Sequence, residues 1–391
     1  MEIPLPEIEP LLSFLQDIIR IPSPSTRERG VVERVAEEMK RVGFAEVFID
    51  EVGNVVGRIG SGSGKSLLYD AHTDTVGIGD PVAWSRDPYG AEIEEGVLYG
   101  RGAADNKGAL AAMIYGAESL IDADLDLTGD LYVVGSVQEE DCEGYAIGLL
   151  CRKSKPHAVL LGEPTNLQIS RGQRGRIMLV VTSHGRSCHA SSPQLGVNAI
   201  YGMNKVVAGV EALNSKLAHH PFLGPGSIAV TRIEGAGASL NVVPDTCRAY
   251  LDRRLTWGED EALALSQVKE IIEEKGVRAE VETVIYEARS HTGYPCHKKK
   301  YFPAWLLEKE DPLLKMGART VKRALGYDPQ IIGWRFSTDG VATKGELGIP
   351  TIGFGPGEEA HCHTTEDQVK VEDLLKAAQV YAQFAVDFLG R

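Results

Sequence analysis

The chain has 391 residues, of which 43% are hydrophobic and 25% charged, the composition of an ordinary soluble globular protein. Because a single hydrophobic core stops growing at roughly 250–300 residues, this length predicts two domains. The formal net charge of −14 argues against nucleic acid as a partner, since phosphate binding requires a basic surface.

The sequence carries no signal for a membrane or for export. No apolar run approaches the ~20 residues that span a membrane. The N-terminal stretch MEIPLPEIEP lacks a basic region followed by an apolar one, so we expect no signal peptide. The six cysteines are scattered without a CxxC pair, and a chain of this size needs no disulfides. We therefore expect reduced thiols and a cytoplasmic location.

The N-terminal part of the chain alternates between two kinds of periodicity. Apolar residues recur at helical spacing over residues 10–21 and 28–42, and Pro22 ends the first run. Short apolar runs predict buried strands over residues 66–71, 130–137 and 158–161, and residues 109–120 predict a helix. This alternation predicts an α/β fold with a largely parallel, mixed sheet flanked by helices.

The middle of the chain follows a different order. Its patterns predict strands over residues 176–183, 227–233, 245–255 and 278–286, with helices over 198–217 and 259–275. The order β-α-β-β-α-β is that of a split, ferredoxin-like unit. We therefore predict an inserted domain over residues 176–287. The first domain is then discontinuous, with residues 1–175 and 288–391.

Five clusters of histidine and acidic residues lie at predicted strand ends and glycine turns. Zinc takes imidazole and carboxylate ligands, and parallel sheets bind ligands beyond the carboxyl ends of their strands. Each cluster alone is read more simply as a polar loop. Together they favour a pair of zinc ions that activates a water for attack on an amide. They are AHTDT (residues 71–75), GRGAADNKG (100–108), QEED (138–141), GEPT (162–165) and AHCHTTED (360–367).

The residue types within these clusters suggest roles. His72 and Asp74 leave a strand end on one face, where an imidazole can bind metal and the carboxylate can orient it. Asp105 lies in a glycine-rich segment, where a carboxylate can bridge two metals. Glu139 and Glu140 are adjacent, so that one can coordinate metal while the other takes a proton from water.

These five motifs, in this order, resemble the co-catalytic zinc metallopeptidases of clan MH. That family includes acetylornithine deacetylase, succinyl-diaminopimelate desuccinylase, aminoacylase and glutamate carboxypeptidase, and the resemblance covers essentially the whole chain. It implies two Zn²⁺ ions per subunit, with Co²⁺ or Mn²⁺ as substitutes. The implied metal ligands are His72, Asp105, Glu140, Glu163 and His363.

The resemblance also implies how these residues divide the work. His72 and Glu163 would hold one zinc, Glu140 and His363 the other, and Asp105 would bridge them. Glu139 would be the general base, with Asp74 orienting His72. The HTxxE pattern of the family starts at His363 and not at His361. Cys362, between the two histidines, is the lesser alternative as a soft ligand.

In this family the inserted domain is a lid that dimerises and carries a histidine in a GxxxHAS setting, here residues 185–191. The resemblance implies that His189 polarises the scissile carbonyl in the site of a partner subunit, where charge develops on oxygen. Asn241 and Arg254 match the substrate-holding pair, and Arg254 can grip a carboxylate through two parallel hydrogen bonds. Arg253 is the alternative, because alternate strand residues face opposite sides.

The implied substrate is a small N-acyl amino acid, so that the protein would be a deacylase. The alternative is a carboxypeptidase or dipeptidase acting on small peptides with a free C-terminal carboxylate. The segments RGQRGR (residues 171–176), SxDG (337–340) and GFGPG (353–357) resemble a subgroup linked to selenium metabolism in bacteria.

Two competing interpretations fit less well. GSGSGKS (residues 60–66) resembles a phosphate-binding loop, but Ile59 stands where that motif needs a glycine, and a strand follows where it needs a helix. A non-catalytic metal-binding protein on the same fold would need the ligands but not the base, Glu139.

Overall fold

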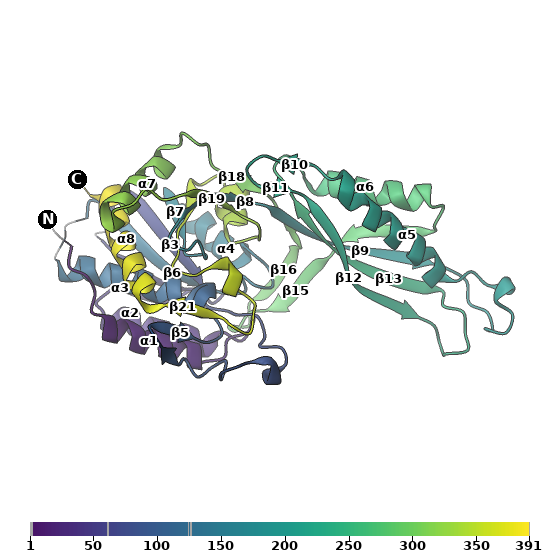
Figure 1. Ribbon diagram of the computed structural model, residues 1–391, viewed down its shortest axis with the longest axis horizontal. Helices are drawn as coiled ribbons and strands as arrows, with labels where there is room; N and C mark the ends of the chain where they lie inside the picture. Colours follow the sequence, from purple (N-terminus) through teal and green to yellow (C-terminus); the bar gives the residue numbers. More distant parts are fainter. Residues whose placement is uncertain (1–2, 61, 124, 126, 391) are drawn as a thin grey trace.

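The structure is a computed structural model that describes residues 3–60, 62–123, 125 and 127–390. Two large sheets occupy the two ends of its long axis (Figure 1). The first has nine strands in the order β1-β2-β6-β3-β7-β20-β8-β18, with β19 also paired to β8. These strands are β1 (Glu46–Ile49), β2 (Val55–Ile59), β3 (Ser66–His72), β6 (Asp130–Ser136), β7 (Ala158–Leu161), β8 (Ile169–Gln173), β18 (Trp305–Leu306), β19 (Ile331–Trp334) and β20 (Thr351–Gly353).

The middle of the first sheet is parallel. Strands β6, β3, β7 and β20 run in one direction, whereas β1, β2 and β18 are antiparallel to their neighbours. All residues of β3 after Ser66 are buried, because both faces of the sheet are covered. Covered parallel strands read as continuous apolar runs. The sheet therefore has the mixed, largely parallel form that the alternating pattern predicts.

Helices cover both faces of this sheet. Leu67 and Tyr69 of β3 belong to a core shared with α1, α2, α3 and α8. Leu68, between them, belongs to a smaller core shared with α4. This alternation follows the two-residue repeat of a strand. The helices are α1 (Ile8–Arg20), α2 (Arg29–Arg41), α3 (Gly108–Asp122), α4 (Tyr145–Ser154), α7 (Pro312–Leu325) and α8 (Val371–Leu389).

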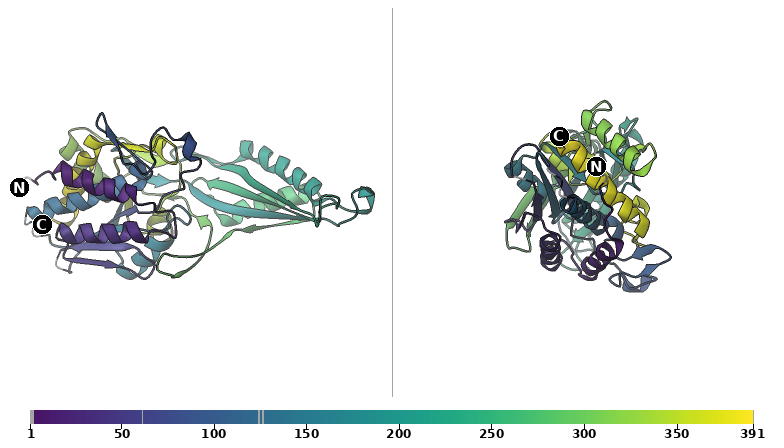
Figure 2. Two further views of the ribbon diagram at one scale, coloured as in Figure 1. Left: turned by 90° about the horizontal axis from the view of Figure 1, so that it is seen from below. Right: turned by 90° about the vertical axis from the view of Figure 1, so that its left-hand side faces the viewer.

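The second sheet is antiparallel and extends away from the first (Figure 2). Its strand order is β12-β13-β9-β14, with β17 also paired to β9. Helices α5 and α6 pack on it around a separate core. Its elements are β9 (Gly175–His184), α5 (Ala199–Leu213), β12 (Ser227–Ala236), β13 (Thr246–Leu255), α6 (Glu261–Glu274), β14 (Ala279–Thr283) and β17 (Tyr301–Phe302).

Smaller sheets complete the fold. β4 (Ile93–Glu94), β5 (Val97–Tyr99) and β21 (Gln368–Lys370) form one of them, and β10 (His219–His220) pairs with β11 (Gly224–Pro225). Along the described residues, no helix has the length and apolar character needed to cross a membrane. All six cysteines lie in the described part of the chain, and each is a free thiol.

The single strand predicted over residues 278–286 is wrong, because the structure forms two strands there. β14 ends at Thr283, and β15 (Ile285–Arg289) turns away to pair with β16 (Pro295–Lys299). β17 then pairs with β9 at Ile177 and Arg176, just beyond the residues that β14 covers. The edge of β9 is thus shared by two short strands with a hairpin between them. Residues beyond 287 consequently contribute to the second sheet.

The helix predicted over residues 198–217 is also shorter than expected. α5 ends at Leu213, and residues 214–216 form a 3₁₀ turn. The side chain of Asn214 accepts a hydrogen bond from the Ile228 amide at 2.9 Å and donates one to the Ile228 carbonyl at 2.6 Å. Asparagine side chains that bond to backbone groups compete with helix formation, which explains the early end.

Gly353 at the end of β20 makes room for Trp334 of β19. A Cβ at position 353 would lie 1.8 Å from the Trp334 ring. Trp334 is 1% exposed, and it packs edge-on against Trp305. Its indole N–H donates to the carbonyl of Pro164 at 2.8 Å. The GFGPG segment therefore supports the GEPT turn through a buried tryptophan.

We predict that Gly353→Ala lowers the free energy of unfolding by about 1–3 kcal/mol, the usual cost of overpacking a core. The ring that would have to move is fully buried, so relaxation is restricted. Gly77→Ala is the matched control, because a Cβ there meets no atom within 4 Å. Urea denaturation of both variants measures the difference. Equal stability would show that Trp334 moves freely.

Candidate metal centre and active site

The topology of the first sheet places three of the five motifs at one edge. β3, β6 and β7 are parallel neighbours, and His72 at the end of β3 pairs in register with Ser136 at the end of β6. The QEED motif follows β6 and the GEPT motif follows β7. Their side chains therefore leave the sheet at its carboxyl edge, the place where open α/β sheets bind ligands.

Asp105 lies between two histidines. It comes from an irregular turn, Ala103–Lys107, just before α3, and its own backbone is not helical. One carboxylate oxygen is 2.9 Å from Nε2 of His72, and the other is 3.3 Å from Nε2 of His363. Oε2 of Glu140 is 3.0 Å from the same His363 nitrogen. Ligand atoms of His72, Asp105 and Glu140 all lie within 4.8 Å of one another. This arrangement suits a shared metal-binding carboxylate.

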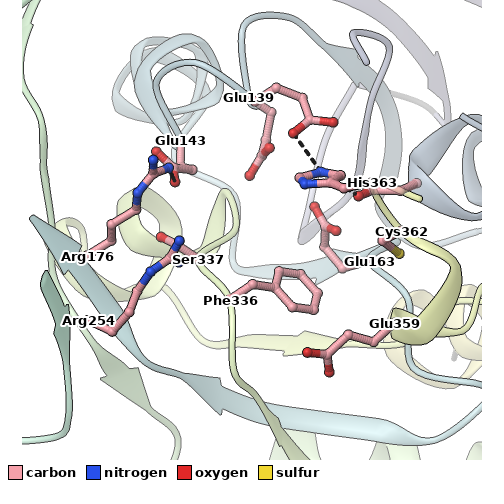
Figure 3. Close-up of a pocket in the computed structure, with 12 residues that line it drawn as sticks. Glu139, Glu143, Glu163, Arg176, Arg254, Phe336, Ser337, Glu359, Cys362 and His363 are labelled. Carbon is pink, nitrogen blue, oxygen red and sulfur yellow. Dashed lines mark hydrogen bonds and ion pairs between the residues drawn. The ribbon is translucent and has the colours of Figure 1, made fainter. Parts of the chain in front are cut away.

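Two further glutamates flank His72. Oε1 of Glu163 is 3.9 Å and Oε2 of Glu139 is 4.0 Å from its Nε2. Both side chains are buried, with 4% and 6% exposure. Figure 3 shows both pointing into the same pocket as His363. Oε1 of Glu139 is buried without a hydrogen-bond partner among the described residues. A buried carboxylate oxygen without a partner fits a site built for cations.

The electrostatics of this cluster depend on charge compensation. Burial and the neighbouring carboxylates raise the pKa of Glu139 and Glu163 well above the usual range, although His72 acts in the opposite direction. Burial lowers the pKa of His72, but the hydrogen bond and charge of Asp105 outweigh it and raise the value. Hydrogen bonds to Asp105 and Glu140 raise the pKa of His363 to about 10. The cluster thus holds positive charge strongly.

Asp74 differs in detail from the sequence-based expectation. Its backbone carbonyl accepts a hydrogen bond from Nδ1 of His72 at 2.8 Å, whereas its carboxylate is 3.6 Å from that nitrogen. The carboxylate instead accepts hydrogen bonds from the amides of Glu139 and Glu140, at 3.1 and 3.2 Å. Asp74 therefore orients the imidazole with its main chain and holds the QEED loop with its side chain.

The histidine at position 361 lies apart from the cluster. Nε2 of Gln368 lies 3.1 Å from Nε2 of His361, and His361 lines a different small cavity. Cys362 lines the main cavity, and its thiol donates to the carbonyl of Glu358 at 3.5 Å. Of the two histidines, the structure brings only His363 to Asp105 and Glu140.

The opposite wall of the cavity is basic. Arg254 on β13 and Arg176 on β9 both line the cavity of about 250 Å³ (Figure 3). Arg254 pairs with Asp252 at 2.7 Å, and Arg176 pairs with Asp252 at 3.1 Å and with buried Glu143 at 2.8 Å. Arg253 faces the other side, where it is buried and paired with Glu259 at 2.5 Å. Arg254 is thus the residue that faces the cavity.

Arg176 and Glu143 are lining residues that the sequence analysis missed. Arg176 pairs directly with Arg254 across β9 and β13. Directly paired residues share a face of a sheet, so the strand pairing was the signal that could have found it. Glu143 continues the acidic run after QEED, and that run also resembles a solvated loop.

His189 and Asn241 lie outside this cavity. The two are close together, because His189 forms a bridge with Val242 and the amide of Ala190 donates to the carbonyl of Asn241 at 2.8 Å. They precede β13, whereas Arg254 lies near its end. Thr246 and Arg254 are eight residue steps apart on β13, about 26 Å at ~3.3 Å per step, and Asn241 comes before Thr246. A single chain therefore does not assemble the predicted substrate-holding pair.

Known proteins resemble this chain throughout its length. Residues 68–387 match the model of peptidase family M20/M25/M40. The uncharacterized protein YgeY of Escherichia coli (strain K12) is 38% identical over 380 residues, which cover 96% of this chain and 94% of that protein.

Solved structures share the fold. An M20 family metallo-carboxypeptidase, Sso-CP2 of Sulfolobus solfataricus, superposes with a TM-score of 0.77 at 18% identity over 96% of this chain and 98% of its own. YxeP of Bacillus subtilis, described as a dinuclear metal binding peptidase, has a TM-score of 0.69 at 16% identity over 98% of both chains. With the histidine and carboxylate cluster, these matches show that the chain is a metallohydrolase of peptidase family M20/M25/M40.

Proposed function

We propose that the protein is a two-zinc deacylase that cleaves the amide bond of N-acyl amino acids. The observation that supports this most is Asp105, whose two oxygens face His72 and His363 across one cavity. The opposite wall of that cavity carries Arg254. Such a site combines a place for two cations with an anchor for a substrate carboxylate.

The donor set fits a pair of borderline cations. His72 and Glu163 would hold one zinc, Glu140 and His363 the other, and Asp105 would be shared. Imidazole and carboxylate groups suit Zn²⁺, with Co²⁺ or Mn²⁺ as substitutes. When bound, such a pair supplies Lewis acidity and lowers the pKa of water.

The protein's own residues would do the rest. Glu139 would accept the proton of the attacking water and later return this proton to the leaving amine. Arg254 would hold the carboxylate of the amino acid, so that the acyl carbonyl faces the metal ligands. Asp74 would orient both His72, through its backbone carbonyl, and the QEED loop, through its carboxylate.

A dipeptidase or carboxypeptidase is the second candidate. Glu143 and Glu359 line the same cavity, and a carboxylate there would suit the free amino group of a short peptide. Relatives of this fold include a metallo-carboxypeptidase and an aminopeptidase, PepT of Bacillus cereus. Either substrate would present its free carboxylate to Arg254.

A homodimer would bring His189 and Asn241 of one subunit to the cavity of the other. His189 and Asn241 lie at the end of the second sheet remote from their own cavity. Leu195, Val197 and Tyr201, which follow His189 in the sequence, are 65%, 53% and 72% exposed. Neighbouring exposed apolar side chains are typical of association surfaces. We propose that each subunit presents His189 and Asn241 to the cavity of its partner.

Glu139→Gln should lower turnover by about 10²–10⁴-fold, the usual effect of losing a general base. The amide of the variant cannot take a proton, which explains the loss of turnover. Glu139 is not one of the proposed metal ligands, so metal content should stay unchanged. Elemental analysis and steady-state kinetics measure both quantities. His363→Ala should lose metal, whereas His361→Ala should retain it. Unchanged turnover in Glu139→Gln would remove that residue from the role of base.

Metal binding should release protons. In the metal-free protein the pKa of His363 is about 10, so at pH 7 the imidazole carries a proton that a metal must displace. Metal affinity should therefore fall as the pH falls. Titration of chelator-treated protein with Co²⁺ in weak buffer, followed with a pH indicator, measures the release. His363→Ala should release fewer protons. A titration without acidification would contradict the assigned ligand.

A substrate panel should separate the two candidates. N-acyl amino acids and dipeptides are each compared with their C-terminal amides, and the free acids should react faster because Arg254 binds the carboxylate. Arg254→Ala should raise KM for the acids. Arg248→Ala, an exposed arginine on the same strand, is the control and should leave KM unchanged. Equal cleavage of acids and amides would exclude carboxylate recognition. Cleavage of dipeptides alone would replace the deacylase with the dipeptidase.

Mixing two inactive variants should restore activity if His189 acts in the partner's site. In a mixed dimer of His189→Ala and Glu139→Gln, one cavity contains both an intact Glu139 and an intact His189. The expected result is partial recovery after subunit exchange, with light scattering to show the dimer. A fully active monomer, or mixtures without recovery, would contradict a role in the partner's site.

A further inference from the structure

The loop that carries Glu139 and Glu140 is held by side chains from distant segments. Its four consecutive amides, residues 137–140, each donate to a side-chain oxygen, in place of the backbone bonds of a helix or strand. The acceptors lie 3.1, 3.1, 3.1 and 3.2 Å away and are, in order, Asn54, Glu28, Asp74 and Asp74. The direction of the two glutamates therefore depends on these three side chains.

Gln138 is the conformationally unusual residue of this loop. Its φ is 60°, in the left-handed region that costs a non-glycine residue roughly 1–2 kcal/mol. Its side chain is fully buried, and Oε1 accepts a hydrogen bond from the Tyr286 hydroxyl at 3.0 Å. The surroundings must hold such a conformation for it to persist. Gln138 is thus fixed at its amide by Glu28 and at its side chain by Tyr286.

The contacts of Glu28 are with backbone amides, and one of them is the amide of Gln138. Glu28 precedes α2, is 0% exposed, and its Oε1 accepts from the amides of Thr26 at 2.8 Å and Gln138 at 3.1 Å. It is not one of the residues lining the cavity. A buried carboxyl group without a cationic partner among the described residues is costly, and the hydrogen bonds from these two amides offset part of that cost.

Tyr286 connects the loop to the other half of the molecule. It lies on β15, in the hairpin that leaves the second sheet and reaches back to the first (Figure 1). The hairpin tip is fastened there, because Nε2 of His291 bonds to the carbonyl of Gly53 at 3.0 Å and Thr292 donates to the carbonyl of Glu51 at 2.7 Å. Tyr286 is 7% exposed.

We propose that Glu28 and Tyr286 are positioning residues for Glu139 and Glu140. By fixing Gln138 in its left-handed conformation, they set the direction in which the next two carboxylates enter the cavity. The inference rests on the proposed function, in which Glu139 is the base and Glu140 a metal ligand. Neither Glu28 nor Tyr286 touches the reacting groups, so both act through Gln138.

Conservative variants separate positioning from general stability. Burial and the nearby Asp74 raise the pKa of Glu28 to about 8, so its carboxyl is mostly protonated at pH 7. Glu28→Gln therefore keeps the size, the charge state and the oxygen that accepts from Gln138. Glu28→Leu removes that acceptor, and Tyr286→Phe removes only the hydroxyl. Tyr115→Phe is the matched control, because its buried hydroxyl bonds to Glu38, far from this loop.

Hydrogen–deuterium exchange of the metal-loaded protein gives a readout that needs no substrate. In Glu28→Leu and Tyr286→Phe, amides 137–140 should exchange at least about fivefold faster, the effect of losing one hydrogen bond of about 1 kcal/mol. Exchange elsewhere should stay constant. Glu28→Gln and Tyr115→Phe should match the parent protein in this loop. Peptides that span residues 137–144 carry the measurement.

Kinetics on a substrate from the panel give the second readout. Glu28→Leu and Tyr286→Phe should lower kcat by about five- to tenfold, while KM changes by less than about twofold. Glu28→Gln should keep the kcat of the parent protein. Unchanged exchange at residues 137–140 in both Glu28→Leu and Tyr286→Phe would overturn the proposal, as would a loss in Glu28→Gln equal to that in Glu28→Leu. If Glu28→Leu does not fold, Tyr286→Phe and Glu28→Gln still decide it.

The two hypotheses can fail separately. Full activity of Glu139→Gln would remove Glu139 from the role of base in the proposed function, whereas the exchange data would still show whether Glu28 and Tyr286 hold the loop. Conversely, unaltered exchange with an inactive Glu139→Gln would overturn the positioning role and leave the hydrolase intact.

Discussion

Crowding of buried carboxylates at the carboxyl edge of the first sheet is the constraint on which the site depends. Glu139 and Glu163 lie close to Asp105, and burial raises the pKa of both glutamates well above the usual range. Like charges in a low dielectric repel unless cations or protons compensate them. His72 and His363 supply part of that compensation, and the metal ions typical of this family would supply the rest. The free energy of folding and the capacity to bind cations are therefore linked at this edge.

The sequence was sufficient to predict that three of the five motifs meet, because strand direction decides it. His72, Glu139 and Glu163 each follow an apolar run, and parallel neighbours bring their ends together. The resemblance to the family, through its HTxxE pattern, separated His363 from His361, and the structure also places them apart. What local pattern could not supply was orientation. The carbonyl of Asp74 faces His72 while its carboxylate holds a loop, a choice that depends on backbone direction beyond the strand.

Residues recruited from distant segments escaped the sequence analysis for a related reason. Glu28 precedes a helix and Tyr286 was predicted to end a strand, so neither position suggests contact with the QEED loop. The break at Val284 depends on β17, which occupies the edge of β9 from further along the chain. Competition between two segments for one strand edge is a tertiary effect that strand propensity does not contain.

The docked hairpin formed by β15 and β16 limits how the two halves of the molecule can move. The chain passes into the second sheet at Gly175, where a Cβ would lie 2.6 Å from the carbonyl oxygen of Phe302, the residue at which it leaves. The two crossings therefore form one narrow neck. The hairpin attaches the second sheet to the first part of the molecule at a further point, away from that neck. Rotation of the second sheet relative to the first therefore involves either release of the hairpin tip at His291 or bending where the hairpin joins the second sheet, at residues 284 and 300.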